Sequence, residues 1–574
     1  MATDAGQGEQ LVIVGIDLGT THSLIGYFGE DGPKLFPNAL GELLTPSVVS
    51  VDDDGHMIVG EAARDRLISH PQSSVATFKR WMGASRETEL GRRMFRPEEL
   101  SALVLRSLIV DAEAALGEKV EEAVISVPAY FSDAQRKATR AAGELAGIKV
   151  ERLINEPTAA ALAYGLEAKP EGSRFLVFDL GGGTFDVSVL ETFEGVVEVH
   201  ASAGDNYLGG EDFLDVLEGA CLSDLKLRTE DFSPIERGLL RRRLEVLKRA
   251  LSQQPEQRID CLIGERTMRW EIDQDRFLQL AEPLMQRMRA PLERALRDAR
   301  LQPEQLSEIV LVGGASRMPL VSRLIARMFG RLPLRHINPD EAIALGACVA
   351  SGLKRRNVKL DEIILTDVCP YTLGVEVGQK DEHGNTQNGL FSPIIQRNSV
   401  VPISRESTYY PLGDRQKVLS LKVYQGESPL VAKNIKLGQL EVPLNPTLPI
   451  ADNGVKVRFT YDINGVLQVE ATPIASGTRY ELVLEQNPGI LSEAEIRARL
   501  TALSELKIHP RSKQENIALL ARAERLFEEH IVARDLLRGW IGEFNQSLES
   551  QDEQRIRDHR SRLSQAMDEL EHQL

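Results

Sequence analysis

Two stretches of the chain combine an aspartate, glycines and threonines in the order that a phosphate-binding turn requires. Phe175 to Leu190 reads FLVFDLGGGTFDVSVL, and Leu11 to Phe28 reads LVIVGIDLGTTHSLIGYF. Each begins as an apolar, β-rich run, reaches an aspartate (Asp179, Asp17), turns on glycine and threonine, and resumes as a strand. Glycine lets backbone N–H groups approach a phosphate where a β-carbon would collide, and successive N–H groups form an anion-binding concavity. The pattern therefore predicts a phosphate cradle built from a β-hairpin.

The polar side chains of these turns suit a nucleotide. An aspartate at a strand end can hold the hydration shell of Mg²⁺, which keeps several waters and needs few carboxylates. The hydroxyls of Thr20, Thr21 and Thr184 add hydrogen-bond donors. P-loop and Rossmann sites run from glycine into a helix, whereas His22–Phe28 and Phe185–Leu190 have strand character. One copy would equally fit a plain tight hairpin, but two copies predict two similar lobes facing one nucleotide.

Two further residues are candidates for the chemistry. Lys79 lies beside the apolar anchors Phe78 and Trp81 and could reach a γ-phosphate or orient the attacking water, although most lysines are solvated surface residues. Glu156 ends an expected strand and precedes Pro157, which opens an alanine-rich helix that runs through Tyr164. Because proline disfavours helical geometry in the preceding residue, we expect Glu156 at a strand-to-helix corner. There it could face a metal ion or simply complement the helix dipole.

Other segments position these groups. We expect a strand over Val124–Phe131, a helix from Ser132 or Asp133 to about Gly147, a glycine-punctuated loop over Ala203–Phe213, and a strand and glycine turn over Ile309–Pro319 as a third nucleotide contact. Residues 214–300 are expected to be mainly helical, with a small strand region near 258–272. Within them Glu245, Lys248, Arg249 and Ser252 share one helical face, which by pattern alone is an ordinary exposed charged face.

The C-terminal part changes character. In residues 361–367, acidic residues flank an apolar tetrad. We interpret this segment as a docking linker without a secondary-structure partner of its own, since a purely flexible linker would be rich in Gly and Ser. Short alternating segments over 368–484 predict a β-sandwich. Helical periodicity returns after Ser492, which forms a capping box with Glu495. Pro510 breaks the first helix of this part. One later helix has an apolar face formed by Leu536, Leu537, Trp540, Ile541, Phe544 and Leu548.

Composition limits the alternatives. The 574 residues exceed one core, so two to four domains are expected, and 68 basic against 85 acidic residues argue against nucleic acid as a general partner. Four cysteines, far apart and without a CxxC pair, are typical of reduced cytosolic thiols. Met1–Gln10 lacks a signal pattern and no apolar segment reaches membrane-span length, so we expect a cytoplasmic protein without membrane insertion.

Together these motifs closely resemble the seventy-kilodalton heat-shock chaperone (DnaK-like) family from Val12 to about Leu484, and more loosely beyond. The motifs are IDLGTT, VPAYFSDAQR, INEPTAAALAYGL, FDLGGGTFDVS, GDNYLGGEDF, LVGGASRMP, NPDEA and DVCPYTLGVEV. The DVCP variant and short C-terminus are similar to the HscC-type bacterial branch. The resemblance implies an actin-like two-lobed ATPase domain (1–357), an interdomain linker (358–367), a β-sandwich substrate-binding domain (368–490) and a short helical lid (491–574).

The resemblance also implies roles for individual residues. Asp17, Asp179 and Asp186 would surround Mg²⁺ and K⁺ shells, Lys79 would position the hydrolytic water, and Glu156 and Asp179 would be candidate proton acceptors, with Thr184 at the phosphates. The residues implied around ATP are Gly19, Thr20, Thr21, Gly181, Gly182, Gly183, Gly209, Gly210, Glu245, Lys248, Arg249, Ser252, Gly313, Gly314, Arg317 and Asp340.

Function in this family depends on coupling between the domains. ATP binding would draw the linker onto the lobes and open the β-module, and hydrolysis would trap an extended apolar peptide of an unfolded client, with a J-domain co-chaperone as partner. The residues implied in the interdomain relay and J-domain contact are Pro128, Arg136, Arg152, Asn155, Ile363, Ile364, Leu365 and Asp367. Those implied in peptide binding are Leu373, Val375, Tyr409, Leu412, Leu419 and Leu421.

Three departures limit this transfer. Residues 213–245 are shorter than the family norm, which makes dependence on a nucleotide-exchange factor doubtful. Gly378–Gly389 is a polar insertion where the family has a short loop with the residue that faces Leu412, and the helical end is shortened.

Three other functions share parts of the pattern: a metabolic kinase with two cradles, a binding-only holdase or exchange factor, and an actin-like filament former. The appended β-module disfavours the first and third, and the intact Lys79, Glu156, Asp179 and Thr184 disfavour the second.

Overall fold

The chain forms two compact units. A computed structural model describes residues 12–51, 57–91, 93–166, 169–193, 196–263, 266–334, 337–354, 364–380, 386–462, 465, 467–483, 519, 523, 533–550 and 552–573. The units divide between Tyr371 and Thr372, and Arg397–Val401 return to the first unit. The described part of the predicted linker therefore belongs to the first unit.

The first half of this unit is built on a six-stranded sheet. Its order is β11-β10-β1-β2-β3, with β4 paired to β2. β1 and β2 form the predicted antiparallel hairpin, in which Gly15 lies opposite Gly26, and β10 runs parallel to β1. The strands are β1 (Ile13–Asp17), β2 (His22–Gly29), β3 (Gly32–Leu35), β4 (Thr45–Pro46), β10 (Glu122–Val127) and β11 (Lys149–Asn155).

Helices α2 (Pro97–Leu116) and α3 (Asp133–Ala146) share a hydrophobic core with this sheet. The predicted start of α3 is confirmed, because the Ser132 hydroxyl accepts a hydrogen bond from the Gln135 amide, and the helix ends before Gly147 at a φ of 91°. The smaller elements nearby are β5 (Val48–Val51), β6 (Met57–Val59), α1 (Glu61–Ser69), η1 (Pro71–Ser73), β7 (Ser74–Ala76), η2 (Phe78–Trp81), β8 (Thr88–Leu90) and β9 (Arg93–Phe95).

The second half repeats the hairpin arrangement. β12 and β13 pair antiparallel with Asp179 opposite Asp186, and β17 runs parallel to β12, as β10 does to β1. The sheet order is β17-β12-β13-β14-β18-β21. Its strands are β12 (Arg174–Leu180), β13 (Phe185–Phe193), β14 (Val196–Asp205), β17 (Glu308–Val312), β18 (Ile364–Val368) and β21 (Val400–Val401).

Two helices pack closely between the repeated halves. α4 (Glu156–Ala163) and α10 (Ala342–Lys354) approach so closely that a β-carbon on Gly346 would lie 1.7 Å from the carbonyl oxygen of Ala159. Gly15 allows the same approach of β1 to α10, since its β-carbon would lie 2.3 Å from the backbone of Ala347. α4, α10 and β1 are therefore held together by backbone contacts rather than by adaptable side chains.

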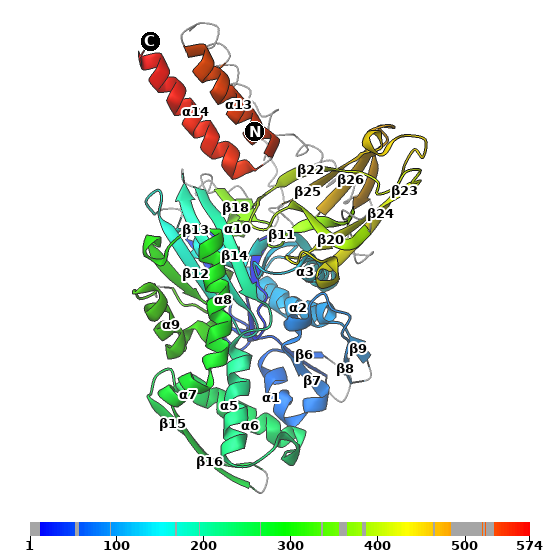
Figure 1. Cartoon of the computed structure of the whole chain (residues 1–574). Coiled ribbons are helices and arrows are strands. Elements are labelled where there is room, and N and C mark those ends of the chain that lie inside the picture. Colours follow the sequence, from blue (N-terminus) through cyan, green and yellow to red (C-terminus); the bar gives the residue numbers. More distant parts are fainter. Residues whose placement is uncertain are drawn as a thin grey trace, which may run out of the picture. The chain divides into compact units, whose positions relative to one another are not determined.

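A mainly helical segment extends the second half, as expected for residues 214–300 (Figure 1). Leu244 of α6, Trp270 of β16 and Met288 of α8 belong to one buried cluster that also contains Phe178 of β12. The elements are α5 (Gly210–Asp224), η4 (Thr229–Asp231), α6 (Pro234–Ala250), β15 (Glu256–Ile263), β16 (Arg266–Asp273), α7 (Gln274–Leu280), α8 (Glu282–Asp298), η5 (Pro303–Gln305), η6 (Gly314–Arg317) and α9 (Pro319–Phe329).

The second unit contains two four-stranded antiparallel sheets, in agreement with the predicted sandwich strands. Their orders are β20-β19-β23-β24 and β22-β25-β26-β27. Val375, Val423, Val457 and Val469 are fully buried. The strands are β19 (Leu373–Lys380), β20 (Thr386–Ile395), β22 (Ile403–Tyr409), β23 (Val418–Gln425), β24 (Ile435–Pro443), β25 (Val455–Tyr461), β26 (Leu467–Pro473) and β27 (Tyr480–Val483), with short turns η8 (Val431–Lys433) and η9 (Ile450–Asp452).

In the described part of the helical end, helices α13 (Arg534–Ser550) and α14 (Glu553–Gln573) share a hydrophobic cluster. Leu537, Phe544 and Leu548 are buried in this cluster, with Trp540 and Ile541 packed against it, as the apolar stripe predicts. The stripe was wrong for Leu536, which is 50% exposed. The predicted capping box of Ser492 and Glu495, and the break at Pro510, lie outside the described residues.

The structure corrects two further expectations. Ile364–Val368 is not without a secondary-structure partner, because β18 pairs in parallel with β14 and antiparallel with β21. Glu156 is the first residue of α4, so the corner residue outside the helix is Asn155. Within the polar insertion after Gly378, β19 and β20 continue to pair through Lys380 and Thr386.

Candidate active site

The two glycine bends face one cavity of about 920 Å³ in the first unit. In the first bend, the Ser47 hydroxyl donates to the Gly19 carbonyl at 2.8 Å, and the Gly19 amide donates to the Ser23 hydroxyl at 3.1 Å. In the second, the Gly181 amide donates to the Thr184 carbonyl at 3.0 Å. The bends touch, because a β-carbon on Gly182 would lie 2.3 Å from Thr21 Cγ2.

A lysine and carboxylates of both halves meet at this cavity. Lys79 is 3% exposed, and its Nζ lies 3.0 Å from Glu156 Oε1 and 5.5 Å from the centre of the Phe131 ring. The alternative of a solvated surface lysine is therefore wrong for Lys79. Asp17 accepts a hydrogen bond from the Ser126 hydroxyl at 2.7 Å, and Asp179 lines the same cavity.

Burial and mutual repulsion raise the pKa values of these carboxyls. Burial, followed by the charge of Glu156, raises the pKa of Asp17 to about 7 and that of Asp186 to about 8. The same two causes raise the pKa of Asp179 well above its usual value. Acidic groups crowded in this way are stabilised in the ionised form when a cation shares the site.

The donor set fits a hydrated cation. Within the described chain, Asp179 Oδ2 and both carboxyl oxygens of Asp186 are buried and have no hydrogen-bond partner. The described residues contain no group of three His, Cys, Asp or Glu side chains arranged to hold a metal directly. Mg²⁺ is commonly held through its waters by one or two carboxylates together with substrate phosphates. Asp17 and Asp179 could contribute to such an outer arrangement.

The charged face of α6 forms another wall of the cavity. Glu245 forms an ion pair with Lys248 at 2.6 Å and accepts a hydrogen bond from Arg249 at 2.8 Å. Lys248 is 7% exposed, and its ammonium also donates to the Gly210 carbonyl at 2.9 Å, which ties α6 to the loop beside the second bend. This face is therefore not the ordinary exposed face that its spacing alone indicates. Ser252 follows the helix and also lines the cavity.

Most of the predicted nucleotide-site residues line this cavity. They are Asp17, Gly19, Thr20, Thr21, Lys79, Glu156, Asp179, Gly181, Gly182, Thr184, Gly210, Glu245, Lys248, Arg249, Ser252, Gly313, Gly314, Arg317 and Asp340. Arg317 Nη2 donates to Asp340 Oδ2 at 2.7 Å. Gly183, Gly209 and Asp186 are not among its lining residues. Gly183 instead lies against Thr20, where its β-carbon would be 2.7 Å from Thr20 Cγ2.

Sequence reasoning missed several lining residues, namely His22, Arg64, Glu211, Arg241 and Arg242. Two of them carried a usable signal. His22 directly follows the first bend, and Arg241 precedes Glu245 by one helical turn on the same face of α6. Burial, and then the charges of Arg249 and Arg64, lower the pKa of His22 to about 4, so its imidazole is neutral at pH 7.

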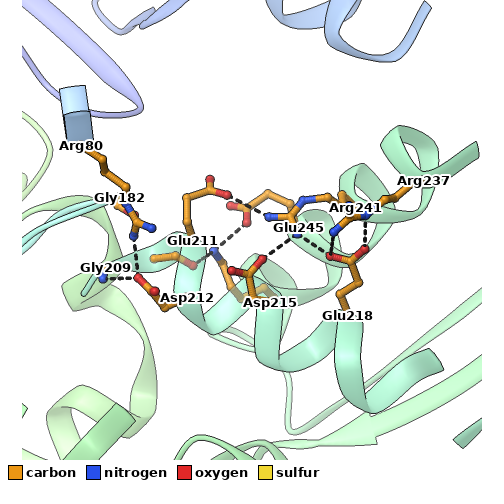
Figure 2. A network of polar contacts seen from close by, with 12 residues as sticks. Arg80, Gly182, Gly209, Glu211, Asp212, Asp215, Glu218, Arg237, Arg241 and Glu245 are labelled. Carbon is orange, nitrogen blue, oxygen red and sulfur yellow. Dashed lines mark hydrogen bonds and ion pairs between the residues drawn. The ribbon is translucent and has the colours of Figure 1, made fainter. Parts of the chain in front are cut away.

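Figure 2 shows how α5 and α6 are joined behind this wall. Arg241 forms ion pairs with Glu211 at 3.1 Å, with Asp215 at 2.7 Å, and with Glu218. Arg237 reaches the same Glu218 at 2.7 Å. Because Glu218 is buried, two arginines hold its pKa below the ordinary value despite the opposing effect of burial. The network fixes the rotation of α6, and with it the face that lines the cavity.

At the other end of Figure 2, an ion pair connects the two halves of the unit. Arg80 Nη2 of η2 lies 2.5 Å from Asp212 Oδ2 of α5, and the two side chains are 16% and 18% exposed. Asp212 Oδ2 also accepts from the Gly209 amide at 2.8 Å. A residue adjacent to Lys79 is therefore anchored beside the second bend.

The predicted interdomain residues also come together within the first unit. Arg136 Nη2 donates to Asn155 Oδ1 at 2.7 Å, and the Asn155 amide donates to the carboxyl of Asp367. Burial raises the pKa of Asp367, against the opposing charge of Arg136, and Arg152 lies near the same carboxyl. Pro128 begins the turn before α3. Ile363 lies outside the described residues, and only the backbones of Ile364 and Leu365 are described.

The predicted peptide-binding residues differ in accessibility. Leu373, Val375 and Leu421 are at most 3% exposed and belong to the interior of the β-module. Tyr409 and Leu419 are partly exposed, and the Tyr409 hydroxyl lies 3.0 Å from that of Ser392 on β20. Leu412 is 37% exposed and is placed over a glycine, since a β-carbon on Gly378 would lie 2.6 Å from Leu412 Cδ1.

Comparison with known proteins agrees with this arrangement. The family model for the Hsp70 protein matches residues 13–94 and 84–574. The chaperone protein DnaK of Thermotoga petrophila is 39% identical over 529 residues, which cover 90% of this chain and 87% of the relative. That of Thermosipho africanus is 38% identical over 528 residues, covering 90% and 86%.

The chain belongs to the Hsp70 family. It is an ATP-hydrolysing chaperone, with mixed sheets in its first unit and paired sheets in its second. The described helices include none long and apolar enough to cross a membrane.

Proposed function

We propose that ATP binds between the two glycine bends and is hydrolysed there, and that its state controls peptide binding by the β-module. The observation that supports this most directly is that both bends, the Lys79–Glu156 pair and the α6 wall line one cavity. In this proposal the first unit is an actin-like two-lobed ATPase domain. The base would lie against Glu245 and Lys248, and the phosphates against the bends.

The residues of the bends would hold the phosphates. The backbone N–H group of Gly182 and the hydroxyls of Thr20 and Thr184 are donors that line the cavity. Asp17, Asp179 and Asp186 would hold the hydrated Mg²⁺ and K⁺ that the family uses. When bound, these cations would offset negative charge on the phosphates.

Lys79 would orient the attacking water. Its ammonium is fixed by Glu156 and by the face of the Phe131 ring, so it could present a proton donor at one position in the cavity. Glu156, or the unpartnered Oδ2 of Asp179, would then accept a proton from that water. Positioning and charge stabilisation would supply most of the rate enhancement, because phosphoryl transfer needs little covalent work from a protein.

Coupling would follow from nucleotide-dependent packing of β18. This strand pairs with β14, and Asp367 of the same strand is bonded to Asn155 directly before α4. Glu156, the next residue, is paired with Lys79. A change around Lys79 could therefore alter the hold on β18. The β-module would bind extended apolar segments of unfolded clients, and a J-domain co-chaperone would contact the zone of Arg152 and Asn155.

We also propose the predicted domain limits, 1–357, 358–367, 368–490 and 491–574, as the functional division, and membership of the HscC-type branch. The continuation of β19 and β20 through the polar insertion supports an altered peptide arch opposite Leu412. The short α5–α6 region supports the expectation that exchange-factor dependence is weak.

The test is ATP turnover by the wild type and by Lys79→Ala, each with and without an extended leucine-rich peptide. We expect peptide to stimulate the wild type and Lys79→Ala to lose turnover while it still binds ATP. Lys34→Ala, at an exposed position of β3, is the matched control and should behave as the wild type.

Thermal unfolding must accompany this test, because Lys79→Ala leaves Glu156 buried without its partner, and breaking a buried ion pair typically costs about 3–5 kcal/mol. Turnover that ignores peptide in the folded wild type would contradict the coupled mechanism. Full turnover by Lys79→Ala would contradict the assigned role of the lysine.

A further inference from the structure

Tyr371, after which the chain first passes into the second unit, is held to Tyr130 of the first unit. The Tyr371 hydroxyl donates to the carbonyl oxygen of Tyr130 at 2.7 Å, and the two ring centres are 4.6 Å apart at an angle of 42°. Tyr130 lies in the turn between β10 and α3, directly after Pro128 and Ala129. A hydrogen bond and a ring contact thus hold Tyr371 to the turn that contains Tyr130.

The next residue is anchored in the second unit. The Thr372 amide and hydroxyl donate to the two carboxyl oxygens of Glu427 at 2.9 and 3.0 Å. The Thr372 carbonyl accepts from the Gly426 amide at 2.9 Å. Consecutive residues are therefore fixed in different units, with one peptide bond between the two anchors. A movement of Tyr371 cannot be absorbed by slack chain there, as it would be in a flexible linker.

The Tyr130 turn also contacts the carboxylate end of the active site. The Asn206 side-chain amide donates to the same Tyr130 carbonyl at 3.0 Å. A β-carbon on Gly204 would lie 2.2 Å from Asp186 Oδ1 and 3.1 Å from Tyr130 Cβ, so only glycine allows these two residues to pack across it. Burial raises the pKa of Tyr371, and the charges of Tyr130 and Asp186 add to this effect.

We propose that the hydrogen bond from Tyr371 to Tyr130 is a joint through which the active site and the β-module influence each other, in addition to the packing of β18. The joint rests on the proposed function, because it needs nucleotide and peptide binding to be coupled. A change around Asp186 displaces the Tyr130 turn through Gly204, and Tyr371 then moves Thr372 and the start of β19. Tyr371 is a positioning residue in this arrangement, since it touches no reacting atom.

Tyr371→Phe tests the joint, because it removes the hydroxyl and keeps the ring. The loss of one hydrogen bond, about 1 kcal/mol, corresponds to about fivefold in an equilibrium. We expect basal ATP turnover within about twofold of the wild type and a fall of about fivefold in the ratio of peptide affinities with ADP and with ATP. The factor by which bound peptide raises the ratio of ADP affinity to ATP affinity should fall by the same amount, because binding linkage is reciprocal.

Tyr424→Phe is the matched control. It removes a tyrosine hydroxyl that lies 3.3 Å from Glu376 within the second unit and should leave both ratios unchanged. A structural role alone would lower the unfolding temperature of Tyr371→Phe and leave the affinity ratios as in the wild type, and that result would overturn the joint. If the wild type itself shows equal peptide affinities with ADP and ATP, the proposed coupling has failed before the joint is tested.

Discussion

Thr21 of the first bend lies directly against Gly182 of the second. The β-carbon that any other residue would place at Gly182 falls 2.3 Å from Thr21 Cγ2, 2.9 Å from its hydroxyl and 3.1 Å from its Cβ. Threonine is β-branched and cannot rotate all of these atoms away. The two hairpins can therefore approach this closely only because Gly182 has no side chain.

Gly182→Ala should separate the bends. We expect ATP affinity and turnover to fall by at least about fivefold, since the added methyl group must displace Thr21 or the second hairpin and overpacking commonly costs about 1–3 kcal/mol. Equilibrium nucleotide binding and turnover measure the effect. Gly219→Ala is the control, because its β-carbon meets no atom within 4 Å in α5. Wild-type affinity in Gly182→Ala would show that the bends need not touch.

The Arg80–Asp212 pair should slow nucleotide release by holding the two halves together. Arg80→Gln removes a partly buried ion pair worth about 1 kcal/mol, so we expect bound ADP to dissociate about fivefold faster. Stopped-flow displacement of a fluorescent ADP analogue measures this rate. Arg80→Lys should recover part of the effect, and Arg86→Gln, at an arginine stacked on Trp81, should not change the rate. Equal rates in Arg80→Gln and the wild type would contradict the role of the pair.

The strands, bends and helix starts could be predicted because each depends on residues that are close together in sequence. The apolar run before Asp179 and the Ser132 cap both needed only neighbouring residues. Pattern alone assigned the Lys248 face to solvent, because the Gly210 carbonyl that it meets is 38 residues away in sequence. Arg80 and Asp212 are 132 residues apart, and no local signal links them. The pairing of β18 with β14 was missed for the same reason, since strand partners are set by tertiary structure.

His22 should make the first unit sensitive to acid. Its pKa in the folded chain is about 4 against 6.5 for a free histidine, so the unfolded chain takes up this proton first as the pH falls. The stability that the neutral His22 imidazole contributes is fully present above pH 6.5. As the pH falls to 4, about 3 kcal/mol of the free energy of unfolding is lost progressively. His22→Gln should therefore lose less stability than the wild type over this range. Thermal unfolding without nucleotide, followed from pH 7 to pH 4, measures the difference, and parallel curves would contradict it.

Leu412 should control the escape of bound peptide. It is the exposed leucine that lies over Gly378, and the absence of a side chain there lets it approach the backbone of β19. Removing part of its apolar contact with a peptide costs about 1 kcal/mol, so Leu412→Ala should release a fluorescent apolar peptide about fivefold faster in the ADP state. Leu430→Ala is the control, because Leu430 is 42% exposed in the same unit. Gly378→Ala should also speed release, since its added β-carbon would lie 2.6 Å from Leu412 Cδ1 and displace that side chain. If Leu412→Ala and Gly378→Ala both release peptide at the rate of Leu430→Ala, the peptide does not contact Leu412.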